Sequence, residues 1–188
     1  MTKETIEQQA TQILREEKIS RPPIKSEVLA VFHFGLDFDC CKLNETELAG
    51  LKIAEKKIYI NESRADELAA NVGLKNFTIA HELGHWVLHR NLTGERTTQM
   101  EREADWFATC LLMPEKWVRE EFSKLTDWLL AEMKVDSLAK MFCVSRKAMK
   151  IRLSQRELKL IYVDFNDYSC YRSKEDFLEN KAGQMKLF

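Results

Sequence analysis

The stretch FTIAHELGHWVLH, from Phe77 to His89, decides the fold because it sets two histidines four residues apart on one predicted helix. Residues four apart on an α-helix share a face and are separated by about 6 Å along the axis. His81 and His85 can therefore direct both imidazoles at one cation. Glu82 is turned about 100° away from His81, so it lies beside the cation without binding it. The pattern predicts a metal-dependent hydrolase centre; the alternative is a helix whose histidines only cap and pack.

The following predicted helix, EREADWFATCLLMP (101–114), offers a third ligand. Glu101 and Asp105 share a face that continues through apolar residues, and a carboxylate on such an inward face needs a partner because burying an unpaired charge is costly. A metal ion supplies that partner, so we predict Glu101 as the third ligand. Asp105 can accept the outer N–H of a ligand histidine. Glu103, about 200° round from Glu101, should face solvent.

The chain has two further histidines, and their spacing in the sequence indicates whether they could also bind the metal. His89 is a rival ligand, but its rise of about 12 Å from His81 is too long for bonds of about 2.0–2.1 Å if His85 also binds. We expect His89 to end the helix, where the dipole favours a basic side chain. His33 is remote in sequence and is assigned a structural role. In a site of this kind zinc lowers the pKa of water to about 7, so Glu82 can take its proton at neutral pH.

Composition narrows the remaining function classes. With 188 residues, 45% hydrophobic and 31% charged, the chain has the make-up of an ordinary soluble globular protein. A net charge of -1 gives no global argument for nucleic acid or membrane partners. Five cysteines, an odd number without CxxC spacing, speak against a disulfide framework and a thiolate zinc site. The polar start and the lack of any apolar run near about 20 residues predict a cytoplasmic protein without membrane contact.

Apolar residues at helical spacing predict helices along most of the chain, with short strands near its first third. The runs DFDCCKL and KKIYIN predict a small antiparallel sheet. The fold class is therefore α+β and mainly helical. Helices are expected in the opening segment before Arg21, from there through about Phe34 with Gly35 as stop signal, and over residues 76–89, 100–113, 127–142 and 146–158, with one more beginning at Pro114.

The two central motifs, together with IYIN (58–61) and LAKMFCVSRKAMKIRL (138–153), resemble the ImmA/IrrE family of zinc metallopeptidase-like proteins over about residues 23–158. The resemblance implies a zincin-like core of the gluzincin type that binds one Zn²⁺ per chain. By that resemblance His81, His85 and Glu101 are the ligands and Glu82 is the catalytic glutamate. It also implies a protein substrate, typically a helix-turn-helix transcriptional repressor of a phage, mobile element or stress response, whose cleavage derepresses genes.

The resemblance leaves some parts of the site to be identified. An extended substrate is expected to pair beside the strand from Ile58 to Asn61. Many family members carry a basic residue just before the first motif, and Lys75 stands there in this chain. A peptidase also needs a donor for the oxyanion, for which Tyr59 is a weak candidate. Four parts are expected: an N-terminal helix (1–22), the zincin-like core (23–130), a helix-turn-helix-like element packed on the core (131–160) and a C-terminal extension (161–188).

The helix-turn-helix-like element carries a local excess of positive charge. Six basic residues stand against Glu157, a net of 6 − 1 = +5, and Ser145 is a good N-cap for its second helix. Such a helix can enter a major groove and contact phosphates. We favour the alternative, a structural helix pair whose basic face is solvated, and the same surface could dock the repressor. The basic residues are Lys140, Arg146, Lys147, Lys150, Arg152 and Arg156.

Two functions follow. One is a zinc endopeptidase that cleaves a regulatory protein; the alternative is a non-proteolytic, metal-containing regulator that binds a repressor or DNA. The intact Glu82 favours the enzyme, because a purely structural zinc needs no general base. The physiological metal stays open, since a site of two His and one Glu also accepts other divalent ions.

Overall fold

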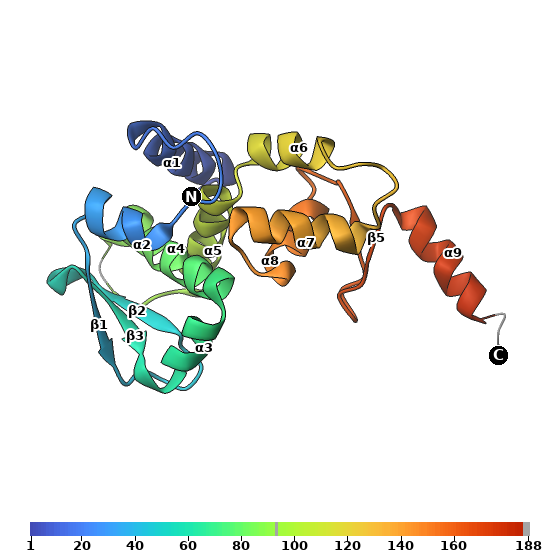
Figure 1. Cartoon of the computed structure of the whole chain (residues 1–188). Helices are drawn as coiled ribbons and strands as arrows, with labels where there is room; N and C mark the ends of the chain where they lie inside the picture. The colour runs from blue at the N-terminus through green and yellow to red at the C-terminus, as the bar shows by residue number, and fades with distance from the viewer. Residues whose placement is uncertain (93, 186–188) are drawn as a thin grey trace. The chain divides into compact units, whose positions relative to one another are not determined.

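The structure, a computed structural model, describes residues 1–92 and 94–185, with side chains through residue 181. Its internal contacts divide the chain into two compact units, Met1–Pro114 with Phe142–Val144, and Glu115–Met141 with Ser145–Phe188. Figure 1 traces the chain from the N-terminus (blue) to the C-terminus (red). Helices predominate and the strands form two small sheets, so the predicted α+β, mainly helical class is confirmed.

The first unit opens with the predicted amphipathic helix, α1 (Lys3–Glu16). Thr2 caps it by accepting a hydrogen bond from Thr5 N, and its apolar stripe is buried and packs on α5. α2 (Ser26–Val28) continues into the π-helical turn η1 (Leu29–His33). Gly35, at φ +62°, takes the left-handed conformation that ends this segment, as its sequence position predicted.

A three-stranded sheet follows, made of β1 (Asp37–Cys41), β2 (Ala49–Lys52) and β3 (Lys57–Asn61) in the order β1-β3-β2. β2 is antiparallel to β3, but β1 runs parallel to β3, so the sheet is mixed and the purely antiparallel pairing expected from sequence is wrong. The reason is that β2, which lies between them in sequence, takes the other edge of β3. The central strand β3 is therefore paired on both sides and cannot receive a substrate strand, contrary to the expectation for Ile58 to Asn61.

Two long helices complete the first unit, after the short η2 (Ile53–Glu55), η3 (Glu62–Arg64) and α3 (Ala65–Ala70). α4 (Val72–His89) begins four residues before the predicted start because Asn71 caps it by accepting from Leu74 N at 3.0 Å. α5 (Thr98–Leu112) is capped by Thr97 in the same way. The two helices pack against each other, and α4 also packs against β2.

The buried side chain of Asn76 ties three segments of the first unit together. Its Oδ1 accepts from Ser26 N at 2.9 Å, and its Nδ2 donates to Ile24 O at 2.9 Å and to Cys143 O at 3.0 Å. These bonds hold the start of α2 against α4. They also satisfy a polar group that would otherwise be costly to bury.

The second unit is built from α6 (Glu115–Ser123), α7 (Ala131–Phe142), α8 (Arg146–Ser154), the antiparallel pair β4 (Tyr162–Val163) and β5 (Cys170–Tyr171), and α9 (Lys174–Met185). Ser145 caps α8 by accepting from Ala148 N at 3.1 Å, as predicted. α8 ends at Ser154, four residues before the predicted end, because Gln155 leaves the helical conformation at ψ 150°.

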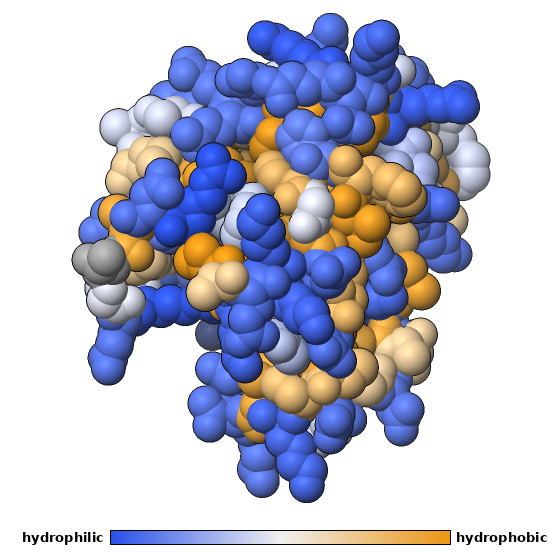
Figure 2. Space-filling model, turned by 90° about the vertical axis from the view of Figure 1, so that its left-hand side faces the viewer, coloured by the Kyte–Doolittle hydropathy of each residue, from blue (hydrophilic) through white to orange (hydrophobic). Residues whose placement is uncertain are grey.

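The surface of the molecule mixes polar and apolar side chains. Figure 2 shows hydrophobic side chains (orange) interspersed with hydrophilic ones (blue) on one face. Single exposed apolar residues, such as Phe32 and Val72, are ordinary in globular proteins. Across residues 1–92 and 94–185, no helix is both long enough and apolar enough to cross a bilayer.

Candidate metal centre

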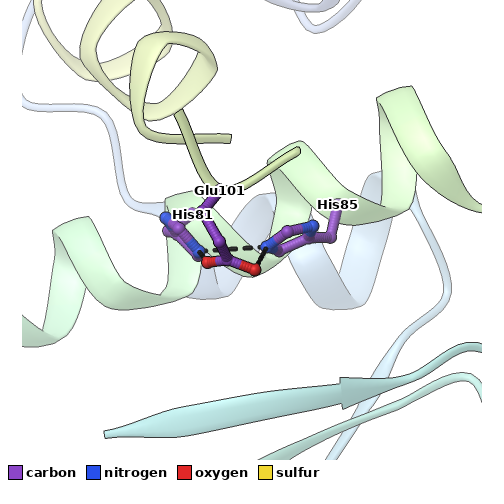
Figure 3. Close-up of side chains that lie close together, drawn as sticks. All are labelled: His81, His85 and Glu101. Atoms are coloured by element: carbon purple, nitrogen blue, oxygen red, sulfur yellow. Dashed lines mark hydrogen bonds and ion pairs between the residues drawn. The ribbon is translucent and has the colours of Figure 1, made fainter. Parts of the chain in front are cut away.

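Three side chains predicted as metal ligands converge at the contact between α4 and α5. His81 Nε2 lies 3.0 Å from His85 Nε2 and 3.1 Å from Glu101 Oε2, and His85 Nε2 lies 3.3 Å from Glu101 Oε1. Figure 3 shows the two imidazoles of α4 and the carboxylate of α5 pointing toward one another. Within the part of the chain that the structure describes, these three form the single His/Cys/Asp/Glu group arranged to hold a metal ion.

The spacing of these atoms fits a small divalent cation. Two bonds of about 2.0–2.1 Å at a tetrahedral angle separate their ligand atoms by about 3.3 Å, close to the observed 3.0–3.3 Å. His81 Nδ1 lies 2.8 Å from Asp105 Oδ1, as the sequence predicted for an outer partner. Since a carboxylate accepts, Nδ1 carries the hydrogen and Nε2 presents a lone pair. Acceptors that face one another in this way need a positive charge between them, which either a proton on His81 Nε2 or a bound metal ion would supply.

The protonation of the two histidines differs. Burial opposes the charged form of His81, but the hydrogen bond to Asp105 and the charges of Glu82, Asp105 and Glu101 outweigh it and raise the pKa of His81. Burial lowers the pKa of His85 to about 3, helped by the charge of Arg96, so His85 is a neutral imidazole. A neutral imidazole is the form that binds a metal.

Glu82 lies beside the three converging atoms and outside their group, as helix geometry predicted. It is buried, with 3% of its surface exposed, and burial raises the pKa of its carboxyl against the opposing charge of Arg96. A buried carboxylate with a raised pKa is suited to act as a general base, because its proton affinity moves toward neutral pH.

A cavity of about 430 Å³ opens over this group in the first unit. Its walls combine the face of α4 that carries His81 and Glu82, the beginning of α5, and the segment that leads into β2. A cleft of this size, with a few convergent polar groups, is typical of a ligand site. It is lined by Thr46, Glu47, Leu48, Ala49, Leu74, Phe77, Thr78, His81, Glu82, Arg96, Glu101 and Asp105.

Arg96 is a residue of the candidate site that sequence reasoning missed. It lies in the connection between α4 and α5, and its Nη2 is 3.0 Å from Glu82 Oε2 and 3.5 Å from Leu51 O. Leu48 O accepts from Asn61 N in the ladder with β3, so by the alternation of an antiparallel pair the carbonyl of Leu51 faces away from β3. A lone arginine in a polar loop carries no sequence signal for this position.

One predicted placement, that of Glu103 on α5, needs correction. Glu103 was expected to face solvent, but 13% of its side chain is exposed and its Oε2 lies 3.0 Å from His89 Nε2. His89 ends α4, as predicted; it is buried, and its Nδ1 lies 3.1 Å from His85 Nδ1. The close packing of α5 on α4 brings both sides of α5 near α4, which a helical wheel for one helix does not capture.

The other candidate residues lie away from the cavity walls. Tyr59 donates its hydroxyl to Glu55 and does not line the cavity, so its place gives no support for an oxyanion role. Lys75 forms an ion pair with Glu27 at 2.9 Å. His33 lies beside Glu17, 2.7 Å from its carboxylate, consistent with a structural role.

The basic residues of α8 are engaged within the second unit. Lys150 is buried and donates to Glu132 Oε1 and Tyr168 O, both at 2.6 Å. Arg152 is buried as well, and Arg146 pairs with Glu132 at 2.8 Å. These contacts use charge that a DNA-binding helix would present to phosphates, so they favour the structural alternative.

Comparisons with known proteins agree with the geometry. The family model described as the IrrE N-terminal-like domain (Peptidase M78) matches residues 43–154. A solved structure of a Mycobacterium tuberculosis transcriptional regulator aligns with a TM-score of 0.56 and 17% sequence identity over 84% of this chain and 50% of that chain. At this identity the likeness shows the fold alone, and the chain spans about half the length of that regulator. A search of curated proteins finds no significant match.

Proposed function

The chain belongs to the Peptidase M78 family of IrrE N-terminal-like domains, and from this premise we propose that it is a zinc-dependent endopeptidase that cleaves a specific regulatory protein. The observation that carries the proposal is the convergence of His81 Nε2, His85 Nε2 and a Glu101 carboxylate oxygen within 3.0–3.3 Å, beside the buried Glu82. A site of this composition is the gluzincin type, with two histidines and one glutamate.

His81, His85 and Glu101 would hold one Zn²⁺ per chain, and Asp105 would fix the tautomer of His81. When bound, the zinc supplies a Lewis acid that polarises the scissile carbonyl and lowers the pKa of water. The chain itself supplies the proton transfers: Glu82 accepts a proton from the attacking water and passes it to the leaving amine. Arg96, 3.0 Å from Glu82, holds that carboxylate in place before substrate binds.

The outer edge of β2 is the best place for an extended substrate. Among the described residues, β2 is an edge strand of its sheet, and Ala49 borders the cavity that contains His81 and Glu82. An unfolded segment of a protein can add to such an edge through main-chain hydrogen bonds. The segment would then run past the metal ligands, which replaces the pairing with β3 expected from sequence.

The substrate is a helix-turn-helix transcriptional repressor, and its cleavage derepresses genes of a phage, mobile element or stress response. The resemblance to the ImmA/IrrE family supports this class, and a cytoplasmic location suits it. A non-proteolytic regulator is the alternative, and the related Mycobacterium tuberculosis structure is described as a transcriptional regulator. The buried Glu82 favours the enzyme, because a protein that acts only by binding needs no general base there.

Glu82→Gln tests the mechanism. The variant should bind zinc and fold like the parent but cleave at least about 10²-fold more slowly, the smallest effect usual for loss of a general base. Cleavage is measured by mass spectrometry on a proteome-derived peptide library and on purified helix-turn-helix repressors. Glu101→Ala is the matched control, which should lose the metal as well as activity.

Two outcomes would contradict the proposal. Cleavage by Glu82→Gln at the parental rate would remove Glu82 from the mechanism. Zinc-loaded parent that leaves every peptide and repressor intact, while binding a repressor, would establish the non-proteolytic alternative.

A further inference from the structure

A chain of hydrogen-bonding side chains leads from His85 to residues outside the cavity lining. Nδ1 of His85 lies 3.1 Å from Nδ1 of His89, and Nε2 of His89 lies 3.0 Å from Oε2 of Glu103. The side chains of both histidines are 2% exposed and that of Glu103 is 13% exposed. Two buried histidines and a largely covered carboxylate thus form a line that the proposed mechanism does not use.

The hydrogens along this line can be assigned from one end. An ionised carboxylate only accepts, so the hydrogen in the contact with Glu103 belongs to Nε2 of His89. A neutral imidazole carries one ring hydrogen, which leaves Nδ1 of His89 as an acceptor. The hydrogen between the two Nδ1 atoms therefore belongs to His85, and Nε2 of His85 is left with a lone pair.

The lone pair on Nε2 of His85 points toward the other two proposed metal ligands. Nε2 of His85 lies 3.0 Å from Nε2 of His81 and 3.3 Å from Oε1 of Glu101. The opposite assignment, an imidazolium at His89, would make Nδ1 of His85 the acceptor and place a hydrogen on its Nε2. Such a ring could not bind a metal through Nε2. Metal binding through Nε2 of His85, as proposed above, therefore requires the first assignment, in which Nδ1 of His85 donates to His89.

We propose that His89 and Glu103 are positioning residues that hold the ring of His85 with Nε2 bare and aimed at the metal. The proposal rests on the metal-binding role proposed above. Outer partners of a ligand histidine fix its tautomer and ring orientation and raise its basicity. His81 obtains this support from Asp105, a side chain that is 61% exposed, whereas His85 obtains it from a chain shielded from water.

The shielding gives His89 a larger predicted effect than Asp105. A water molecule can take the place of an exposed carboxylate such as that of Asp105, but water has little access to the buried Nδ1 of His85. Removal of the His89 ring nitrogens therefore leaves a buried donor on His85 without an acceptor. Without that hydrogen bond, the tautomer of His85 that leaves Nε2 free to bind a metal is no longer favoured.

His89→Phe and His89→Gln form a matched pair of variants. Phenylalanine keeps the buried ring but offers no nitrogen, and it should weaken zinc binding about 10–100-fold. Glutamine is the poorer filler of the space, yet its oxygen can accept from His85 and its amide can donate to Glu103, so it should recover most of the affinity. A merely structural role would give the reverse order. His33→Phe, a change at a histidine remote from the site, should leave the affinity unchanged.

The readouts are the zinc dissociation constant, measured by competition with a chromogenic chelator, and the visible absorption spectrum of the Co²⁺-loaded protein. In His89→Phe the Co²⁺ spectrum should change as the His85 ligand is lost or displaced. Glu103→Ala is a second variant that keeps both histidines, and it should weaken zinc binding several-fold in the same direction.

The outcomes separate this proposal from the one on which it rests. Parental zinc affinity and an unchanged Co²⁺ spectrum in both His89→Phe and Glu103→Ala would overturn the positioning role and leave the metal site intact. A parent that binds neither ion would overturn the metal site itself and the positioning role with it. Weaker zinc binding in His89→Phe, with recovery in His89→Gln, would establish that His89 and Glu103 position His85.

Discussion

At the scale of single residues, the glycine of the HELGH motif explains how the proposed metal ligands on two helices come together. A Cβ added to Gly84 would lie 2.9 Å from Ala104 Cα and 3.0 Å from Ala104 O, both backbone atoms of α5. Contacts below about 3.0 Å require the backbone to move. Gly84 therefore permits the close approach that brings Glu101 of α5 within reach of His81 and His85 of α4.

Gly84→Ala should push α5 away from α4. The expected cost is about 1–3 kcal/mol of unfolding free energy, as for other overpacked sites, with a weaker zinc affinity because Glu101 moves with α5. Urea unfolding and chelator competition measure the two effects. Gly50→Ala is the matched control: its new Cβ would meet only Leu43 Cδ1 at 3.6 Å, an ordinary contact. Equal stability and affinity in both variants would show that the helices tolerate the extra carbon.

At the scale of elements, α8 resembles a recognition helix in sequence, but several of its basic side chains are paired within the second unit. Its buried Lys150 connects Glu132 of α7 with the carbonyl of Tyr168. Burial acts to raise the pKa of Glu132, but the hydrogen bonds from Lys150 and Cys170 and the charge of Lys150 outweigh it and lower that pKa below its usual 4.5. A carboxyl whose pKa is lower in the folded state stabilises the fold above its unfolded pKa.

Lys150→Ala should therefore destabilise the second unit at neutral pH by about 1–3 kcal/mol, because it removes the buried cation from Glu132, which keeps only its contacts with Arg146 and Cys170 N, and takes away the Lys150 donor from Tyr168 O. The difference from the parent should shrink as the pH falls below about 4.5 and Glu132 takes up a proton. Urea unfolding from pH 7 to about pH 3 measures it, with the exposed Lys140→Ala as control. If the difference in unfolding free energy between Lys150→Ala and the parent does not change with pH, the lost stability does not come from the Lys150–Glu132 ion pair. If Lys150→Ala keeps the stability of the parent but loses a salt-dependent affinity for DNA, α8 binds DNA instead.

At the scale of the whole molecule, the candidate metal centre lies in one of the two units. The proposed ligands, Glu82, Arg96 and the edge strand β2 all lie within Met1–Pro114, whereas the basic helix α8 lies in the other unit. A ligand that binds only the folded state stabilises it by RT ln(1 + [L]/Kd), about 2.7 kcal/mol at a hundredfold excess over Kd. This stabilisation should appear first where the ligand binds.

Zinc should accordingly slow amide hydrogen exchange in α4 and α5, by up to about 100-fold at a hundredfold excess over Kd, and leave α6–α9 nearly unchanged. Mass spectrometry of peptides from the exchanged protein measures this, and chelation should reverse it. Glu101→Ala with the same zinc should show no protection. Protection that spreads equally through α6–α9 would mean that the two units open together and would contradict a response confined to the first.

The sequence by itself determined what local periodicity controls. A helix that carries His81 and His85 places them on one face whatever surrounds it, and the same holds for Glu101 with Asp105 and for the cap at Ser145. Only the tertiary structure decided which side chains meet across elements: Arg96 with Glu82, His89 with Glu103, and β3 between β1 and β2. These contacts depend on how closely α5 packs on α4 and on which edge each strand takes. Both are properties of non-local packing, which the period of a single helix or strand does not contain.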